Sequence, residues 1–143
     1  MAASEYTSKI TTAAMPAAEI YSALSNLSNL ERVRDFIPQD KVQELEIAPD
    51  YVRMKVDGLG QKFCIRIVDK IENDTIKFGV DNLPLEANFW IQLKQTAPDE
   101  TKIRLTLKAD IPFMFKMMLD KKIQKGLDDA ADMLTQFPYR QWQ

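Results

Sequence analysis

The chain has 143 residues, of which 45% are hydrophobic and 28% are charged, and its net charge is −2. This size and composition are typical of one globular domain, so we predict a single domain spanning residues 1–143. Nucleic-acid binding usually requires a strongly basic surface, whereas this chain balances 19 basic against 21 acidic residues. We therefore expect no nucleic-acid partner.

The sequence contains no histidine. This excludes catalysis by Ser-His-Asp or Cys-His groups and metal sites that are built on imidazole. The single cysteine, Cys64, can form neither an intramolecular disulfide nor a cysteine-rich zinc site. We assign no catalytic residue, no metal ligand and no cofactor. Any acid–base chemistry would have to come from Asp, Glu, Lys, Tyr or Cys64.

The amino-terminal residues Met1–Glu5 carry neither a basic start nor an apolar signal core. No stretch reaches the roughly 18 uninterrupted apolar residues that a membrane span requires. A single free thiol also fits a reducing compartment. We therefore predict a cytoplasmic protein.

The first third of the chain predicts one strand and two short helices. Residues 5–14 alternate, which predicts a strand with Tyr6, Ser8, Ile10, Thr12 and Ala14 on one face. Pro16 suits the first position of a helix. Ser28 or Asn29 then caps a second helix, and Pro38 ends it.

From Lys41 to Ile111 apolar residues recur at every second position, as in strands with one covered and one wet face. Short turns are expected at 57–60, 73–74 and 98–100, which predicts an antiparallel meander of six strands. The inward positions are almost wholly apolar. The polar side chains expected among them are Tyr6, Ser8, Thr12, Gln43 and Gln95.

A long helix is predicted from Phe113 to Phe137. Its apolar stripe falls at i, i+4, i+7, i+11 and i+14, and Pro138 ends it. No other predicted element is long enough to cover the apolar face of the sheet. The stripe consists of Ile123, Leu127, Ala130, Leu134 and Phe137.

The order strand, two helices, six strands and long helix resembles the START-like superfamily, also called SRPBCC or helix-grip proteins, and within it the polyketide cyclase-like branch. The residues that carry this resemblance are the run from Tyr6 to Ile10, the run from Pro16 to Asn26, Asn29-Leu30 leading to Pro38, and Lys125-Gly126-Leu127. The resemblance implies an α+β helix-grip fold, in which a curved antiparallel sheet of about seven strands wraps around the C-terminal helix. It also implies a cavity for lipids, polyketides, quinones or other apolar ligands.

The expected cavity lies between the sheet and the helix. The run from Phe113 to Leu119 holds three of the seven methionines, whose flexible thioethers suit the mouth of an apolar cavity. The alternative is that this run packs against Met15 and the sheet. The predicted ligand-binding residues are Met54, Val56, Phe63, Ile65, Phe78, Val80, Phe89, Ile91, Phe113, Met114, Met117 and Met118.

Charges on the long helix oppose its dipole, with lysines in the first half and aspartates in the second. One interpretation is a basic patch beside the mouth that meets an acidic headgroup or an anionic ligand. The favoured interpretation is that Lys125 pairs with Asp128 and Asp129 on a solvated face. A peripheral membrane contact is thus possible but not favoured, and the oligomeric state is left open.

Three other features have two interpretations each. Cys64 has cationic neighbours that could lower the pKa of its thiol, but we interpret it as an unreactive bystander because no histidine can serve as its base. Trp90 either covers neighbouring side chains or forms a dimer contact. Residues 139–142 either dock on the end of the sheet or fray.

Our functional prediction is the binding of a hydrophobic small molecule without catalysis. One alternative is an enzyme of the polyketide cyclase or aromatase type, for which a suitably placed acid or base is missing from the predicted inner face. A second alternative is an interaction protein with a filled core.

Overall fold

The structure, a computed structural model, describes residues 4–36, 42–56, 62–81, 86–137 and 139; at 33–36, 42 and 56 it describes the backbone alone. The turn predicted at 57–60, the stop at Pro38 and the tail at 140–142 lie outside the described residues. Within them the predicted element order is confirmed, and the fold is α+β.

One antiparallel sheet contains all the described strands, in the order β1-β8-β7-β6-β5-β4-β3, with β2 also pairing with β8. Each neighbouring pair from β3 to β8 is consecutive in the chain, so the predicted six-strand meander is confirmed. The strands are β1 (Ser4–Thr7), β2 (Thr11–Ala13), β3 (Val42–Ile47), β4 (Tyr51–Val56), β5 (Lys62–Ile71), β6 (Thr75–Asp81), β7 (Ala87–Ala97) and β8 (Glu100–Ala109).

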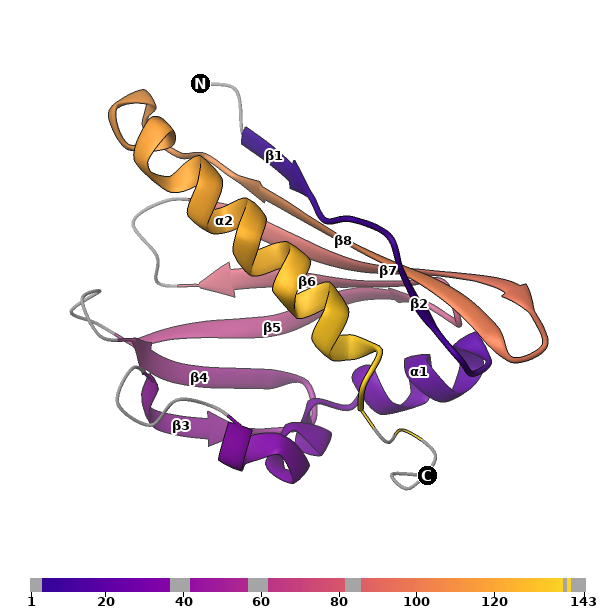
Figure 1. Ribbon diagram of the computed structural model, residues 1–143. Coiled ribbons are helices and arrows are strands. Elements are labelled where there is room, and N and C mark those ends of the chain that lie inside the picture. Colours follow the sequence, from indigo (N-terminus) through magenta and orange to yellow (C-terminus); the bar gives the residue numbers. More distant parts are fainter. Residues whose placement is uncertain (1–3, 37–41, 57–61, 82–85, 138, 140–143) are drawn as a thin grey trace.

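Within the described residues, three helices accompany the sheet. The long helix α2 (Phe113–Leu134) lies diagonally across one face, which we call the inner face (Figure 1). The helix α1 (Ala17–Leu24) lies near the C-terminal end of α2, and the 3₁₀ helix η1 (Leu27–Phe36) follows beside β3. Pro16 is the N-cap of α1 rather than its first residue, and the backbone N–H of Ala17 donates to the Gln95 side chain.

The prediction of one continuous strand over residues 5–14 is wrong. The chain leaves the ladder after Thr7 and returns at Thr11, so the inward parity changes. Tyr6 and Ser8 are buried as predicted, but the next buried residues are Thr11 and Ala13. Ile10 is 64% exposed, and Thr12 and Ala14 are also exposed, contrary to the prediction.

The side chain of Ser8 explains this break. Its hydroxyl accepts a hydrogen bond from the backbone N–H of Leu105 at 2.9 Å and donates to the carbonyl of Lys9 at 2.8 Å. A side chain thus takes the place of a backbone partner in the ladder. Local side-chain bonds of this kind compete with regular strand pairing.

The helix α2 ends at Leu134, three residues before the predicted Phe137. Thr135 closes it, because both its backbone N–H and its hydroxyl donate to the carbonyl of Asp132. Residues preceding a proline are also biased away from helical geometry. At 22 residues, α2 is about 33 Å long.

Two of the other polar residues predicted to point inward are exposed instead, namely Gln43 and Gln95. For Gln43 the reason is a register shift between Gln43 and Glu46, where Glu44 has a positive φ of 53°. The turn predicted at residues 73–74 is confirmed, with Asn73 at a φ of 59°. Asparagine tolerates this left-handed conformation better than most residues.

Candidate functional site

Burial changes along the inner face, from one end of the strands to the other. Register places Ile76, Ile91 and Leu105 in one row across β6, β7 and β8, and all three are buried. The next row toward the start of α2 contains Phe78, Phe89 and Leu107, of which only Phe78 is fully buried. The inner face is therefore closed at one end and contains half-buried side chains at the other, although the small side chains of Ala87 and Ala109 in the following row are buried again.

The same gradient runs through β4 and α2. In β4, Val52 is 3% exposed, whereas Met54, two residues further along the same face, is half-buried. In α2, Ala131 is fully buried and Leu127 nearly so, but Ile123 and Leu119 are only partly covered. We call the two regions the closed end and the open end of the inner face. The closed end contains Ala13, Ala17, Ile20, Val52, Ile76, Ile91, Leu93, Ile103, Leu105, Leu127 and Ala131, and the open end contains Met54, Phe63, Ile65, Val80, Phe89, Leu107, Leu119 and Ile123.

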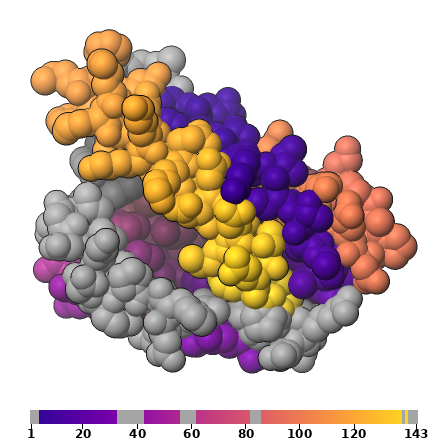
Figure 2. Space-filling view, viewed as in Figure 1, coloured from indigo at the N-terminus to yellow at the C-terminus, as the bar shows by residue number. Residues whose placement is uncertain are grey.

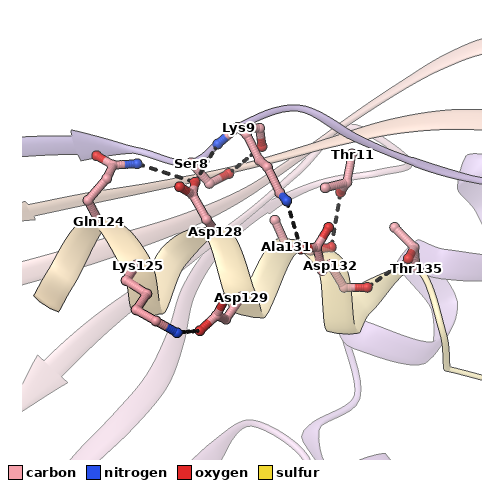
Figure 3. A network of polar contacts seen from close by, with 10 residues as sticks. All are labelled: Ser8, Lys9, Thr11, Gln124, Lys125, Asp128, Asp129, Ala131, Asp132 and Thr135. Atoms are coloured by element: carbon pink, nitrogen blue, oxygen red, sulfur yellow. Dashed lines mark hydrogen bonds and ion pairs between the residues drawn. The ribbon is translucent and has the colours of Figure 1, made fainter. Parts of the chain in front are cut away.

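One flank of α2 is fixed to the N-terminal segment by polar contacts (Figure 3). Asp128 accepts hydrogen bonds from the backbone N–H of Lys9 at 2.7 Å and from the amide of Gln124 at 3.3 Å. The ammonium group of Lys9 pairs with Asp132 at 2.7 Å, and the hydroxyl of Thr11 donates to the carbonyl of Ala131. These contacts hold the second half of the helix over β1, β2 and β8.

The opposite flank of α2 is apolar and only partly covered. Leu119 and Ile123 are four residues apart and so lie on one side of the helix, and Ala130 continues that side. At Gly126 no atom lies within 4 Å of the position a Cβ would take. In the space-filling view a recess opens beside α2, with the magenta strands at its bottom (Figure 2).

The structure brings five of the twelve predicted ligand-binding residues together at the open end. Met54 pairs with Phe63 across β4 and β5, and Ile65 pairs with Val80 across β5 and β6. These four residues and Phe89 are half-buried at the open end. Phe78 and Ile91 are buried and belong to the packed core. The side chain of Val56 lies outside the described residues.

The predicted mouth residues are not part of this group. Phe113, Met114, Met117 and Met118 are 79%, 85%, 84% and 64% exposed, on the first two turns of α2. The alternative interpretation, that this run packs against Met15 and the sheet, is wrong for these residues. Sequence reasoning omitted Leu107, Leu119 and Ile123 from the site. The alternation of β8 could have indicated Leu107, and the helical spacing could have indicated Leu119 and Ile123.

One ionisable pair lies at the open end. The hydroxyl of Tyr6 donates to the carboxylate of Asp120, joining β1 to α2. Tyr6 pairs with Leu107 in the ladder, so its ring lies beside the open-end row. Burial and the bond to Asp120 both raise the pKa of the Tyr6 hydroxyl, which therefore stays protonated at neutral pH.

The buried hydroxyl groups serve structural bonds. Thr101 donates to the carbonyl of Met15, Thr106 donates to the side chain of Gln92, and Ser8 and Thr11 are bonded as described above. Burial raises the pKa of the Cys64 thiol, which opposes the formation of a reactive thiolate. No group of three or more Cys, Asp and Glu side chains that could hold a metal occurs within the residues described.

The structure also describes the surroundings of Trp90 and of Tyr139, the first residue of the tail. Trp90 lies half-buried between the ammonium groups of Lys77 and Lys108, which are 5.4 and 5.8 Å from its ring. This arrangement agrees with the interpretation that Trp90 covers its neighbours. Tyr139 is fully buried and donates to the carbonyl of Leu134, so this first residue of the tail docks rather than frays.

Other hollows have different linings. A groove of about 620 Å³ on the sheet has the charged side chains of Lys94, Lys102 and Arg104 in its lining, together with Ile10 and Leu93. A cavity of about 20 Å³ lies between α1, η1 and Phe137 and is too small for a ligand. Across the described part of the chain, no helix has the length and apolarity needed to span a bilayer.

A curved antiparallel sheet around a long C-terminal helix is the START-like, helix-grip fold that the sequence resemblance implied. Solved structures match it along nearly the whole chain. Norcoclaurine synthase from Thalictrum flavum, in complex with dopamine and hydroxybenzaldehyde, superposes with a TM-score of 0.71 at 15% identity, over 94% of this chain and 86% of that one. A START superfamily protein from Mycobacterium smegmatis gives 0.58 at 17% identity, over 94% and 100%.

A protein from Thermobifida fusca, whose structure was solved by NMR in solution, gives a TM-score of 0.66 at 15% identity, over 94% of this chain and 92% of that one. No protein-family model and no curated protein matches the sequence. The structural likeness establishes the START-like fold, and assignment to the polyketide cyclase-like branch stays a prediction.

Proposed function

We propose that the chain binds a hydrophobic small molecule in the recess between the sheet and the first half of α2, without transforming it. The observation that carries this proposal is the group of partly exposed apolar side chains on β4 to β8 and on the first half of α2, which together line the open end. Exposed apolar surface is costly in water, and a concave arrangement of it suits a ligand. The same observation argues against an interaction protein with a filled core.

The lining indicates the class of ligand. Met54, Phe63 and Phe89 offer adaptable or flat apolar surfaces, and Ile65 and Val80 add branched ones. The polar group beside them is the Tyr6–Asp120 pair, which could orient one hydroxyl or carbonyl of the ligand. A lipid, a polyketide or a quinone would meet these requirements. The structural neighbours support a ligand-binding use of this fold, because one of them was solved with two small aromatic molecules.

The experiment is to fill the recess. Val80→Trp places a large side chain among the half-buried residues of the open end. We expect it to abolish the fluorescence increase of the apolar probe N-phenylnaphthylamine and to remove any apolar ligand seen by native mass spectrometry. Ile71→Trp is the matched control, because Ile71 is 57% exposed at the end of β5. Equal probe binding by both variants and the parent chain would contradict the proposal.

A second candidate function is catalysis at the same recess, and the Tyr6–Asp120 pair favours it. A hydroxyl that donates to a carboxylate is a chemically plausible proton-transfer pair. The test is to incubate the parent chain and Asp120→Asn with the ligand identified by mass spectrometry. A new product that forms only with the parent chain would support an enzyme, whereas unchanged ligand with both would support binding alone.

A further inference from the structure

The first two turns of α2 expose a continuous apolar surface. Met114 and Met117 are 85% and 84% exposed, Phe113 is 79%, Met118 is 64% and Phe115 is 50%. Single exposed apolar residues are common, but five large ones within six positions form a patch. In the space-filling view these turns project at one end of the molecule (Figure 2). We call residues 113–118 the apolar tip.

Unpaired lysines lie beside the apolar tip. Lys116, Lys121 and Lys122 form no ion pair with any described residue, whereas Lys125 is paired with Asp129 at 2.8 Å. The predicted pairing of Lys125 with Asp129 is thus confirmed, whereas Asp128 accepts hydrogen bonds from Lys9 and Gln124 instead. The first turn of α2 contains no acidic residue, and Asp120 is engaged by Tyr6. The positive end of the helix dipole lies at the same place.

We propose that the apolar tip docks on the surface of an anionic lipid bilayer. Lys121 and Lys122 follow Met117 and Met118 by four residues, so each lysine lies on the same side of the helix as a methionine, one turn behind it. Four residues of helix rise about 6 Å. Amphipathic helices insert their apolar residues about 5–10 Å into the headgroup boundary, so the methionines would reach the acyl chains while the lysines stay among the phosphates.

The charges favour a bilayer over a second copy of the chain. A two-fold contact between apolar tips would bring the lysines of one copy against those of the other, because such a contact is formed by the same patch on both sides. Acidic lipid offers the complementary charge instead, and each lysine near such a surface contributes favourably. Docking at the open end of the inner face would also bring the recess to the membrane, but it does not require the recess to be occupied.

The experiment is co-flotation of the full chain with vesicles of phosphatidylcholine that contain about one third phosphatidylglycerol. We expect binding to these vesicles, at least about tenfold weaker binding to pure phosphatidylcholine, and release when salt rises from about 0.1 M to about 0.5 M. Lys121→Gln/Lys122→Gln should weaken binding by more than about tenfold, since each lysine near the surface contributes about fivefold.

Met114→Ser/Met117→Ser should weaken vesicle binding by a similar factor, because both side chains are more than four-fifths exposed and their loss leaves the core intact. Ile71→Ser and Lys94→Gln are the matched controls, at exposed positions far from the apolar tip in sequence, and should bind like the parent chain. Two outcomes would overturn the proposal: no binding to anionic vesicles, or a concentration-dependent dimer that only the methionine variant breaks. The Val80→Trp variant should bind vesicles normally, so failure of ligand binding and failure of docking are distinguishable.

Discussion

The closed and the open end of the inner face are built from the same strands and the same helix, yet they differ in what covers them. At the closed end α1 and Tyr139 complete the core, and Ile20, Ile103 and Tyr139 are fully buried. At the open end α2 is the one described helix over the sheet, and its apolar flank stays partly exposed. The difference shows that a packed core and a partly open recess can share one sheet when α1 covers only one end of it.

The side chains differ in kind as well. The closed end is dominated by Ile, Leu and Ala, whose few rotamers pack densely. The open end contributes Met54, Phe63 and Phe89, together with the exposed methionines of the apolar tip. Methionine adapts to irregular apolar shapes, which suits a surface that must fit a variable partner. The two ends therefore differ in side-chain composition as well as in coverage.

We expect the largest difference in the free energy of unfolding between two isoleucine-to-alanine substitutions, one at each end of the inner face. Ile103→Ala at the closed end should lower the free energy of unfolding by about 3–5 kcal/mol, because the surrounding side chains cannot fill the cavity. Ile65→Ala at the open end should cost only about 1–2 kcal/mol, because Ile65 is already partly exposed. Urea unfolding monitored by circular dichroism measures both. Equal losses would contradict the distinction between the two ends.

The next largest loss of stability is expected in the segment that connects β1 and β2, which lies against the second half of α2. Ser8→Ala should cost about 1–3 kcal/mol, because the buried N–H of Leu105 loses its hydrogen-bond acceptor. Ser4→Ala is a matched control near the start of β1, where the side chain is only half-buried. Urea unfolding again measures the difference, and a neutral Ser8→Ala would show that regular strand pairing replaces the side-chain bond.

Ser8 also shows what alternation could and could not predict. The period of two correctly placed most of the inward residues of β4 to β8, with Gln95 near the end of β7 as an exception, because those strands are regular over most of their length. It failed over residues 8–14 because a single side-chain hydrogen bond shifts the parity, and a serine in an alternating stretch gives no sign of its partner. The partner of Ser8, Leu105, is 97 residues away along the chain.

The members of the candidate site were predictable only in part, and the extent to which each is covered was not predictable. Phe78 and Phe89 follow the same alternation, yet Phe78 is 4% exposed and Phe89 is half-buried. This depends on where α1 and α2 lie over the sheet, which no local pattern contains. The exposure of the apolar tip depends likewise on how far α2 extends beyond the strands. The Tyr6–Asp120 pair joins residues 114 positions apart and had no sequence signal.

A smaller effect, at the closed end, depends on pH. Burial raises the pKa of the Tyr139 hydroxyl above its unfolded value of 10.0. The stabilisation from the neutral, buried hydroxyl is therefore complete below pH 10 and is lost as the pH rises above it. Tyr139→Phe should cost about 1 kcal/mol at pH 7, through loss of the bond to the Leu134 carbonyl.

Above pH 10 the Tyr139→Phe variant should lose stability less steeply than the parent chain, because one of its buried ionisable hydroxyls is gone. The pKa of the Tyr6 hydroxyl is also raised, so both proteins still lose some stability as the pH rises above 10. Urea unfolding between pH 7 and about pH 11 measures the two slopes. Parallel pH profiles would show that Tyr139 ionises as readily in the folded chain as in the unfolded one.

The smallest expected effect is a gain in stability. It tests whether the uncovered flank of α2 has space for an added methyl group. Gly126→Ala should stabilise the chain by about 0.5–1 kcal/mol, because alanine restricts the unfolded chain and is the best helix former. The added methyl group meets no atom within 4 Å. Gly79→Ala is the contrasting variant, since its Cβ would lie 3.2 Å from Cγ1 of Val68 in the packed sheet. We expect thermal unfolding to show a gain for Gly126→Ala and none for Gly79→Ala, and a loss at Gly126 would mean that this flank is closed.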